Sequence, residues 1–170
     1  VHMEEPGLAV ELARAVNDAY AAERRRRTRF TFLATLPLND PAASVVELER
    51  AMRAGLPGAM VFSNVNGVAL ADARYEPLWR KADELGAVIY IHPAHPLGVE
   101  AMEQYWLMPL VGFLMDTTLA AAHLVFAGVP HRYPNITWVL CHMGGAIPYL
   151  AERLDRGFEA FAECRQHIGQ

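Results

Sequence analysis

Four apolar segments of strand length alternate with helical segments, and this alternation limits the fold more than any other feature of the chain. The strand segments are near-continuous apolar runs at residues 29–38, 58–65, 87–93 and 135–145. Runs of this kind are typical of parallel strands that helices cover, because no face of such a strand meets water. The sequence therefore predicts an α/β fold with a parallel sheet.

Residues that typically begin or end helices support the same order of elements. Helices are predicted at residues 7–27, 39–55, 75–86, 116–129 and 146–168, and residues 97–112 are predicted to form an irregular or short helical insertion. Asp40 and Asp116 are the predicted caps of two of these helices. Four strand–helix units fit a small open sheet, and they also fit half of an eight-fold barrel, which typically needs about 250 residues. The pattern alone leaves both open.

Composition narrows the class of protein. The chain has 170 residues, of which 53% are hydrophobic and 20% charged, so a single globular domain over residues 1–170 is predicted. The net charge of −4 argues against nucleic acid as a partner. The one basic run, Arg24–Arg27, is predicted to be a solvated helix end rather than an anion site.

Targeting signals and cysteine pairs are not evident in the sequence. Cys141 and Cys164 do not suggest a disulfide framework. No signal peptide is recognised and no apolar run is judged to approach the length of a membrane span, so a cytoplasmic protein without membrane contact is expected.

Two histidines stand where apolar strands stop. His92 follows the run at 87–91, and His142 follows the run at 135–141. In parallel α/β folds, ligands bind at the carboxyl ends of the strands, where Asn64 or Asn66 would also lie. Imidazole at such a site can bind Zn²⁺ or carry a proton near neutral pH. For each histidine alone, a hydrogen-bonded core or loop position is the alternative, whereas the pair favours function.

Longer motifs around these histidines make a family recognisable. The segments are "HPAHPLG", "GFLMDTTLAAAHLVFAGVPHRYPNITWVL" and "CHMGGAIPYLAERLDRG", preceded by "RFTFLATLPLNDPAASVVELERA" and "SNVNG". In this order they resemble the amidohydrolase-related family (amidohydrolase 2), in its aminocarboxymuconate-semialdehyde decarboxylase-like branch. The resemblance runs from about residue 7 to about residue 160, and the segment around His142 is its most specific part.

The resemblance implies a metal-dependent (β/α)8 TIM barrel with a divalent metal, usually zinc, at the carboxyl ends of the strands. His92 then matches the metal ligand that ends the fifth strand, and His142 matches the base or proton shuttle that ends the sixth. Trp106 matches a substrate-pocket aromatic, Asn66 is a further candidate for substrate binding, and Arg153 matches an arginine that reaches the neighbouring subunit's substrate. A solvated helix position is the alternative for Arg153.

Other parts of the family pattern are absent. The sequence has no His-x-His pair, which normally ends the first strand, and it lacks the aspartate that normally ends the eighth. The strands present would be about the third to the sixth, so the chain is predicted to be a partial barrel. His95 is interpreted as loop structure or pocket wall. Because a catalytic zinc site needs about three protein ligands, the chain alone is expected to be inactive and to associate or belong to a larger fold.

The predicted function of the intact protein is removal of CO2 from an unsaturated or aromatic carboxylate, a small molecule. Hydrolysis of an amide or lactone at the same metal is the nearest alternative, and a truncated, non-catalytic α/β module is another. The resemblance also implies a homodimer, because the arginine that Arg153 matches reaches the neighbouring subunit's substrate.

Overall fold

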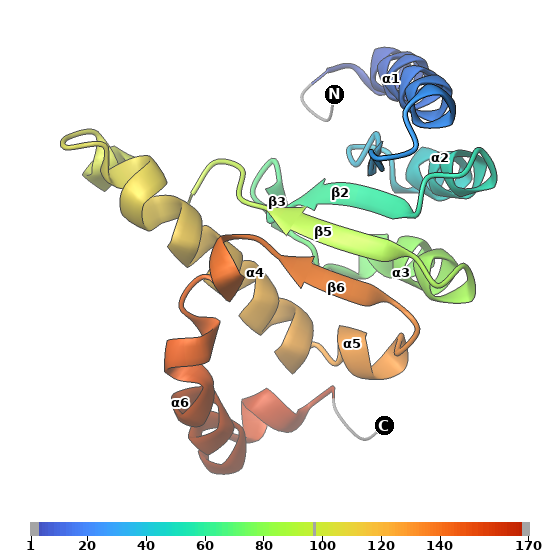
Figure 1. Cartoon of the computed structure of the whole chain (residues 1–170). Helices are drawn as coiled ribbons and strands as arrows, with labels where there is room; N and C mark the ends of the chain where they lie inside the picture. Colours follow the sequence, from blue (N-terminus) through green and yellow to red (C-terminus); the bar gives the residue numbers. More distant parts are fainter. Residues whose placement is uncertain (1–3, 97, 168–170) are drawn as a thin grey trace. The chain divides into compact units, whose positions relative to one another are not determined.

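The computed structural model describes residues 4–96 and 98–167, which form a four-stranded sheet, a two-stranded hairpin and helices. The sheet has the order β1-β2-β5-β6, with bounds Ala34–Thr35, Gly58–Phe62, Val88–His92 and Thr137–Leu140. Figure 1 shows the arrows of β2, β5 and β6 pointing the same way. The parallel arrangement predicted from the apolar runs is therefore confirmed.

The described residues fall into two compact units, and the chain passes between them several times. The first unit holds residues up to Val61 together with Asp72–Tyr90 and Tyr133–Val139. The second unit holds Phe62–Ala71, Ile91–Arg132 and the residues from Leu140 onward. The strands thus begin in the first unit, and the carboxyl ends of β2, β5 and β6 lie in the second. The single domain over residues 1–170 stays a prediction.

Helices α1, α2 and α3 belong to the first unit and cover Pro6–Arg26, Pro41–Arg53 and Glu76–Glu84. As predicted, Asp40 caps α2, because its carboxylate accepts a hydrogen bond of 2.9 Å from the Ala43 N–H. The predicted strand at 29–38 is much shorter than expected. Only Ala34 and Thr35 pair with β2. The Asn17 side chain from α1 accepts a hydrogen bond from the Thr35 N–H at 2.8 Å and donates one to the Thr35 carbonyl at 2.9 Å.

The start of β6 is fixed within the first unit. The Tyr133 hydroxyl donates to Glu76 at 2.6 Å, and the Asn135 N–H donates to Asp83 at 2.7 Å. Burial, followed by the hydrogen bond to Glu76, raises the pKa of Tyr133. Trp138 of β6 lies 5.3 Å from the fully buried Trp79 between ring centroids. These contacts join the chain that leads into β6 to helix α3.

A hairpin that the sequence analysis missed follows β2. Strands β3 (Asn64–Val65) and β4 (Val68–Ala69) pair antiparallel around Asn66 and Gly67. Both turn residues have positive φ, 52° and 80°, as a two-residue hairpin of the Asn-Gly type requires. The Asn-Gly pair between two valines was the signal for this turn.

Helix α4 (Phe113–Phe126) is the central helix of the second unit. It continues from a π-helical turn at Met108–Gly112, so the predicted start at Asp116 is wrong. Asp116 lies inside the helix, buried, and its carboxylate bonds to other segments. The predicted cap is wrong because the apolar residues before Asp116 are themselves helical, so that α4 begins at Phe113.

Two more helices complete the second unit. These are α5 (Val129–Arg132), which the sequence analysis did not predict, and α6 (Ile147–Ala160). Single 3₁₀ turns at Val99–Met102, His142–Gly144 and Ala162–Arg165 belong to this unit, and another at Ala73–Tyr75 belongs to the first. Helix α6 is shorter than the predicted 146–168.

One described segment, Met108–Phe126, is long and apolar enough to cross a membrane by length and composition. The sequence-based judgement that no run approaches this length is therefore wrong. The core helix of a soluble protein passes the same criterion, and this segment carries the buried Asp116. The absence of membrane contact stays a prediction.

Candidate active site at the strand ends

The two histidines singled out in the sequence lie together. His92 is the last residue of β5, and His142 opens the turn after β6. Their ring centroids are 6.0 Å apart. Phe113, at the start of α4, lies 6.5 Å from the His92 ring and 6.3 Å from the His142 ring. The carboxyl ends of β5 and β6 thus present two imidazoles beside one apolar wall.

A backbone carbonyl fixes the tautomer of His92. Its Nδ1 lies 2.8 Å from the carbonyl oxygen of Pro93, and a carbonyl only accepts hydrogen bonds. Nδ1 is therefore assigned the proton, which leaves the lone pair on Nε2. Metal-ligating histidines usually donate their second nitrogen in this way. His92 has the protonation pattern of a metal ligand.

A hydrogen-bond relay indicates the tautomer of His142. Its Nδ1 lies 2.9 Å from Cys141 Sγ, which lies 3.4 Å from Thr117 Oγ1. The Thr117 hydroxyl donates to the Phe113 carbonyl at 3.0 Å, so it can only accept from Cys141. We assign the thiol proton to the Thr117 contact and the Nδ1 proton to the contact with Cys141, because this arrangement makes both contacts hydrogen bonds. This assignment leaves His142 Nε2 unprotonated and able to take a proton.

The turn that carries His142 has an unusual backbone. Residues 142–145 all have positive φ, between 51° and 84°. A Cβ on Gly145 would lie 2.4 Å from the Leu114 carbonyl oxygen and 2.5 Å from Thr118 Oγ1, so only glycine fits there. Left-handed residues of this kind cost free energy and concentrate at functional sites. The "HMGG" motif is the segment that places the exposed His142 ring beyond β6.

A buried carboxylate lies behind the strand ends. Asp116 is 6% exposed and accepts hydrogen bonds from the Ser63 hydroxyl and, at 3.0 Å, from the Ala94 N–H. Asn64 Nδ2 approaches the same carboxylate at 3.4 Å and also the His95 carbonyl. The sequence analysis missed this cluster, although Ser63 stands at the end of an apolar strand as the histidines do.

The remaining candidates are on the surface of the second unit. Trp106 is 79% exposed, with a φ of 57°, and lines a surface pocket of about 360 Å³. Asn66 forms the hairpin turn, and the His95 ring is exposed. Trp106 and Asn66 are both exposed at the surface, and their substrate roles stay predictions.

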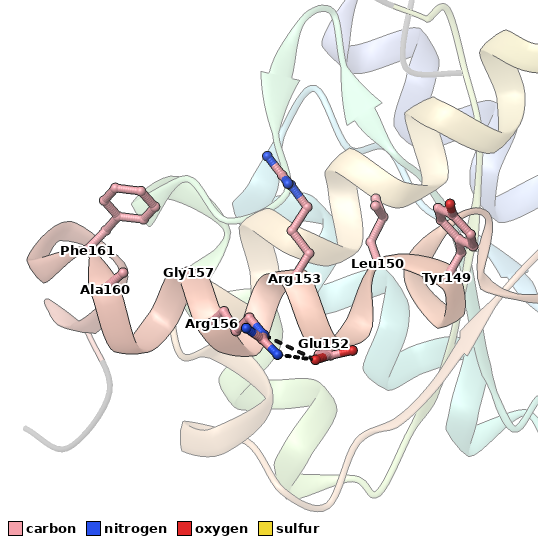
Figure 2. Close-up of a pocket in the computed structure, with 8 residues that line it drawn as sticks. All are labelled: Tyr149, Leu150, Glu152, Arg153, Arg156, Gly157, Ala160 and Phe161. Atoms are coloured by element: carbon pink, nitrogen blue, oxygen red, sulfur yellow. Dashed lines mark hydrogen bonds and ion pairs between the residues drawn. The ribbon is translucent and has the colours of Figure 1, made fainter.

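Arg153 lies on the exposed face of α6. Figure 2 shows Arg153, Leu150 and Tyr149 projecting from one side of the helix, while Arg156 and Glu152 pair on another at 2.6 Å. With Phe161 these residues line an open hollow of about 960 Å³. The role of Arg153 at a neighbouring subunit stays a prediction.

The described residues do not make up a complete metal site. Among residues 4–96 and 98–167, no three His, Cys, Asp or Glu side chains lie close enough together to hold a metal ion. His92 fits as a single donor, and a catalytic site needs about two more protein ligands. A site with about three protein ligands therefore needs at least one donor from outside the described residues.

Comparison with known proteins decides the family. The sequence model described as "Amidohydrolase" matches residues 2–169. The chain belongs to the amidohydrolase family. It is 38% identical, over 91% of its length, to 2-amino-3-carboxymuconate-6-semialdehyde decarboxylase of Dictyostelium discoideum, and covers 44% of that protein. It is 33% identical, over 86% of its length, to gamma-resorcylate decarboxylase of Rhizobium radiobacter, and covers 49% of it.

Comparison with solved structures supports the same family assignment. The crystal structure of 5-carboxyvanillate decarboxylase from Novosphingobium aromaticivorans, in complex with manganese and a nitrobenzoic acid, superposes with a TM-score of 0.89 at 28% identity. The match covers 97% of this chain and 48% of that one. The chain spans about half the length of the curated relatives that it matches. Its fold is therefore part of the amidohydrolase TIM barrel, and the open small sheet is excluded.

Proposed function

We propose that this chain supplies about half of a metal-dependent enzyme that removes CO2 from an aromatic or unsaturated carboxylate. The observation that carries the proposal is the convergence of His92 and His142 at neighbouring strand ends, with Nε2 of each ring assigned a lone pair. The related decarboxylases act on substrates of this class by name.

In the proposed site, His92 Nε2 would be one ligand of a divalent metal. When bound, such an ion supplies a positive charge that orients the carboxylate and acidifies a nearby oxygen. We propose zinc because it accepts imidazole nitrogen readily, with manganese, the ion of the 5-carboxyvanillate enzyme, as the alternative that metal analysis would detect.

His142 would move the proton. Its Nε2 would take a proton from solvent and deliver it to the carbon that bears the carboxylate. The bond from that carbon to the carboxylate then breaks, and its electron pair returns to the substrate's unsaturated system as CO2 leaves. Hydrogen replaces the carboxylate, so atoms and charge balance. Phe113 forms an apolar wall next to both rings.

The same proposal covers the setting of the enzyme. We propose that it is a cytoplasmic homodimer, that Arg153 contributes across the subunit interface, and that Trp106 and Asn66 contact the substrate. The exposure of Trp106 and Arg153 supports these roles, since both side chains are accessible to a partner.

The test is a CO2-release assay on the intact protein that carries this chain, with 2,6-dihydroxybenzoate and 5-carboxyvanillate as substrates. Metal-stripped protein is the control, and the purified mass is compared with 18.9 kDa. We expect CO2 release that returns when zinc or manganese is added back. Amide or lactone hydrolysis without CO2 would instead identify a hydrolase. Neither reaction, together with no bound metal, would identify a non-catalytic module.

A further inference from the structure

The backbone that carries His92 is held at three consecutive residues. The His92 carbonyl accepts from the Ser63 N–H at 2.8 Å. Pro93 restricts its own φ and accepts from the His92 ring. The Ala94 N–H donates both to Asp116 at 3.0 Å and to Ser63 Oγ at 3.1 Å. Residues 92–94 therefore have little freedom to move.

Asp116 is the centre of this arrangement. A buried carboxylate is costly unless hydrogen bonds compensate for its lost hydration. Asp116 receives them from the end of β2, from the segment after β5 and from Asn64. Because α4 carries Asp116, the helix is bonded to Ser63, directly after β2, and to Ala94, two residues after His92. Ala94, whose N–H donates to Asp116, lies only two residues after the candidate ligand His92. The carboxylate therefore holds the backbone next to His92 as well as helix α4.

We infer that Ser63 and Asp116 form a clamp that positions His92 for the metal, without touching metal or substrate themselves. The inference rests on the proposed role of His92. Outer groups that orient a ligand typically contribute roughly 10–100-fold in metal affinity, so this is the size of effect expected. Asp116 is therefore a positioning residue, and His92 is the metal ligand whose position it fixes.

The first readout needs neither metal nor substrate. Hydrogen exchange at the Ala94 amide is measured in the metal-free intact protein, in wild type and in Asp116→Asn, which keeps the size of the side chain. We expect faster exchange in the variant, because one of the two acceptors of the Ala94 N–H is weakened. Asp155→Asn, at an exposed position on α6, is the matched control and should leave Ala94 unchanged.

The second readout is metal affinity by titration calorimetry. Asp116→Asn should bind zinc or manganese roughly 10–100-fold more weakly, and excess metal should restore most of kcat. A purely structural carboxylate would lower the melting temperature without changing metal affinity at temperatures where the protein is folded. If Asp116→Asn does not fold, Ser63→Ala is used, because it removes the other Ala94 acceptor and leaves the Asp116 carboxylate its bonds from Ala94 and Asn64.

The outcomes separate this inference from the proposed function. Unchanged Ala94 exchange and unchanged metal affinity in the folded variant would overturn the clamp, even in an active decarboxylase. Faster Ala94 exchange with weaker metal binding would support it, even if no carboxylate substrate is turned over.

Discussion

The His142→Ala variant of the intact protein is expected to lose about 10²–10⁴-fold in kcat, the usual contribution of a positioned general acid or base. Its metal content should stay unchanged, because the proposed role of His142 is to carry a proton on Nε2. The measurements are CO2 release under saturating substrate and metal analysis of the same sample. The ring is exposed, so its removal should leave the folded structure intact.

His131→Ala is the matched control, since His131 is exposed on the short helix α5 of the same unit. It should retain wild-type turnover and metal. Loss of metal in His142→Ala would show that this ring is a ligand instead of a proton carrier. Full activity in that variant would remove His142 from the mechanism.

The His92→Ala variant is expected to lose most of its bound metal. Removing a ligand should weaken metal binding by more than the roughly 10–100-fold that the loss of an orienting group costs. Elemental analysis after gel filtration measures this directly, and turnover should fall in proportion to the metal lost.

His95→Ala serves as its control, because His95 lies three residues after His92, in the segment that follows β5, and is exposed. It should keep the metal. Zinc or manganese bound to His92→Ala at the wild-type level would disprove the ligand assignment. A lower melting temperature with normal metal content would mean that His92 has a structural role only.

The features that the sequence predicted well depend on local pattern. The apolar runs that end in His92 and His142 place both at the carboxyl ends of parallel strands, and parallel strand ends meet at one edge of a sheet. Asp40 caps α2 as predicted because Pro41 follows it directly. These inferences needed only neighbouring residues.

The features that it missed depend on distant residues or on competing local signals. Asp116 looks like a helix cap, yet α4 extends back to Phe113 and the carboxylate bonds to Ser63, 53 residues earlier. The strand expected at 29–38 shrinks to Ala34 and Thr35, and the Asn17 side chain, 18 residues earlier, bonds to the N–H and the C=O of Thr35. Only the tertiary structure reveals such pairs.

A metal-loaded crystal structure of the intact protein would show whether the His92 and His142 rings serve one metal site. Anomalous diffraction locates the ion. We expect anomalous density within bonding distance of His92 Nε2, with His142 Nε2 nearby and facing the same open space. An ion bound elsewhere, or the two imidazoles turned toward separate sites, would contradict this expectation.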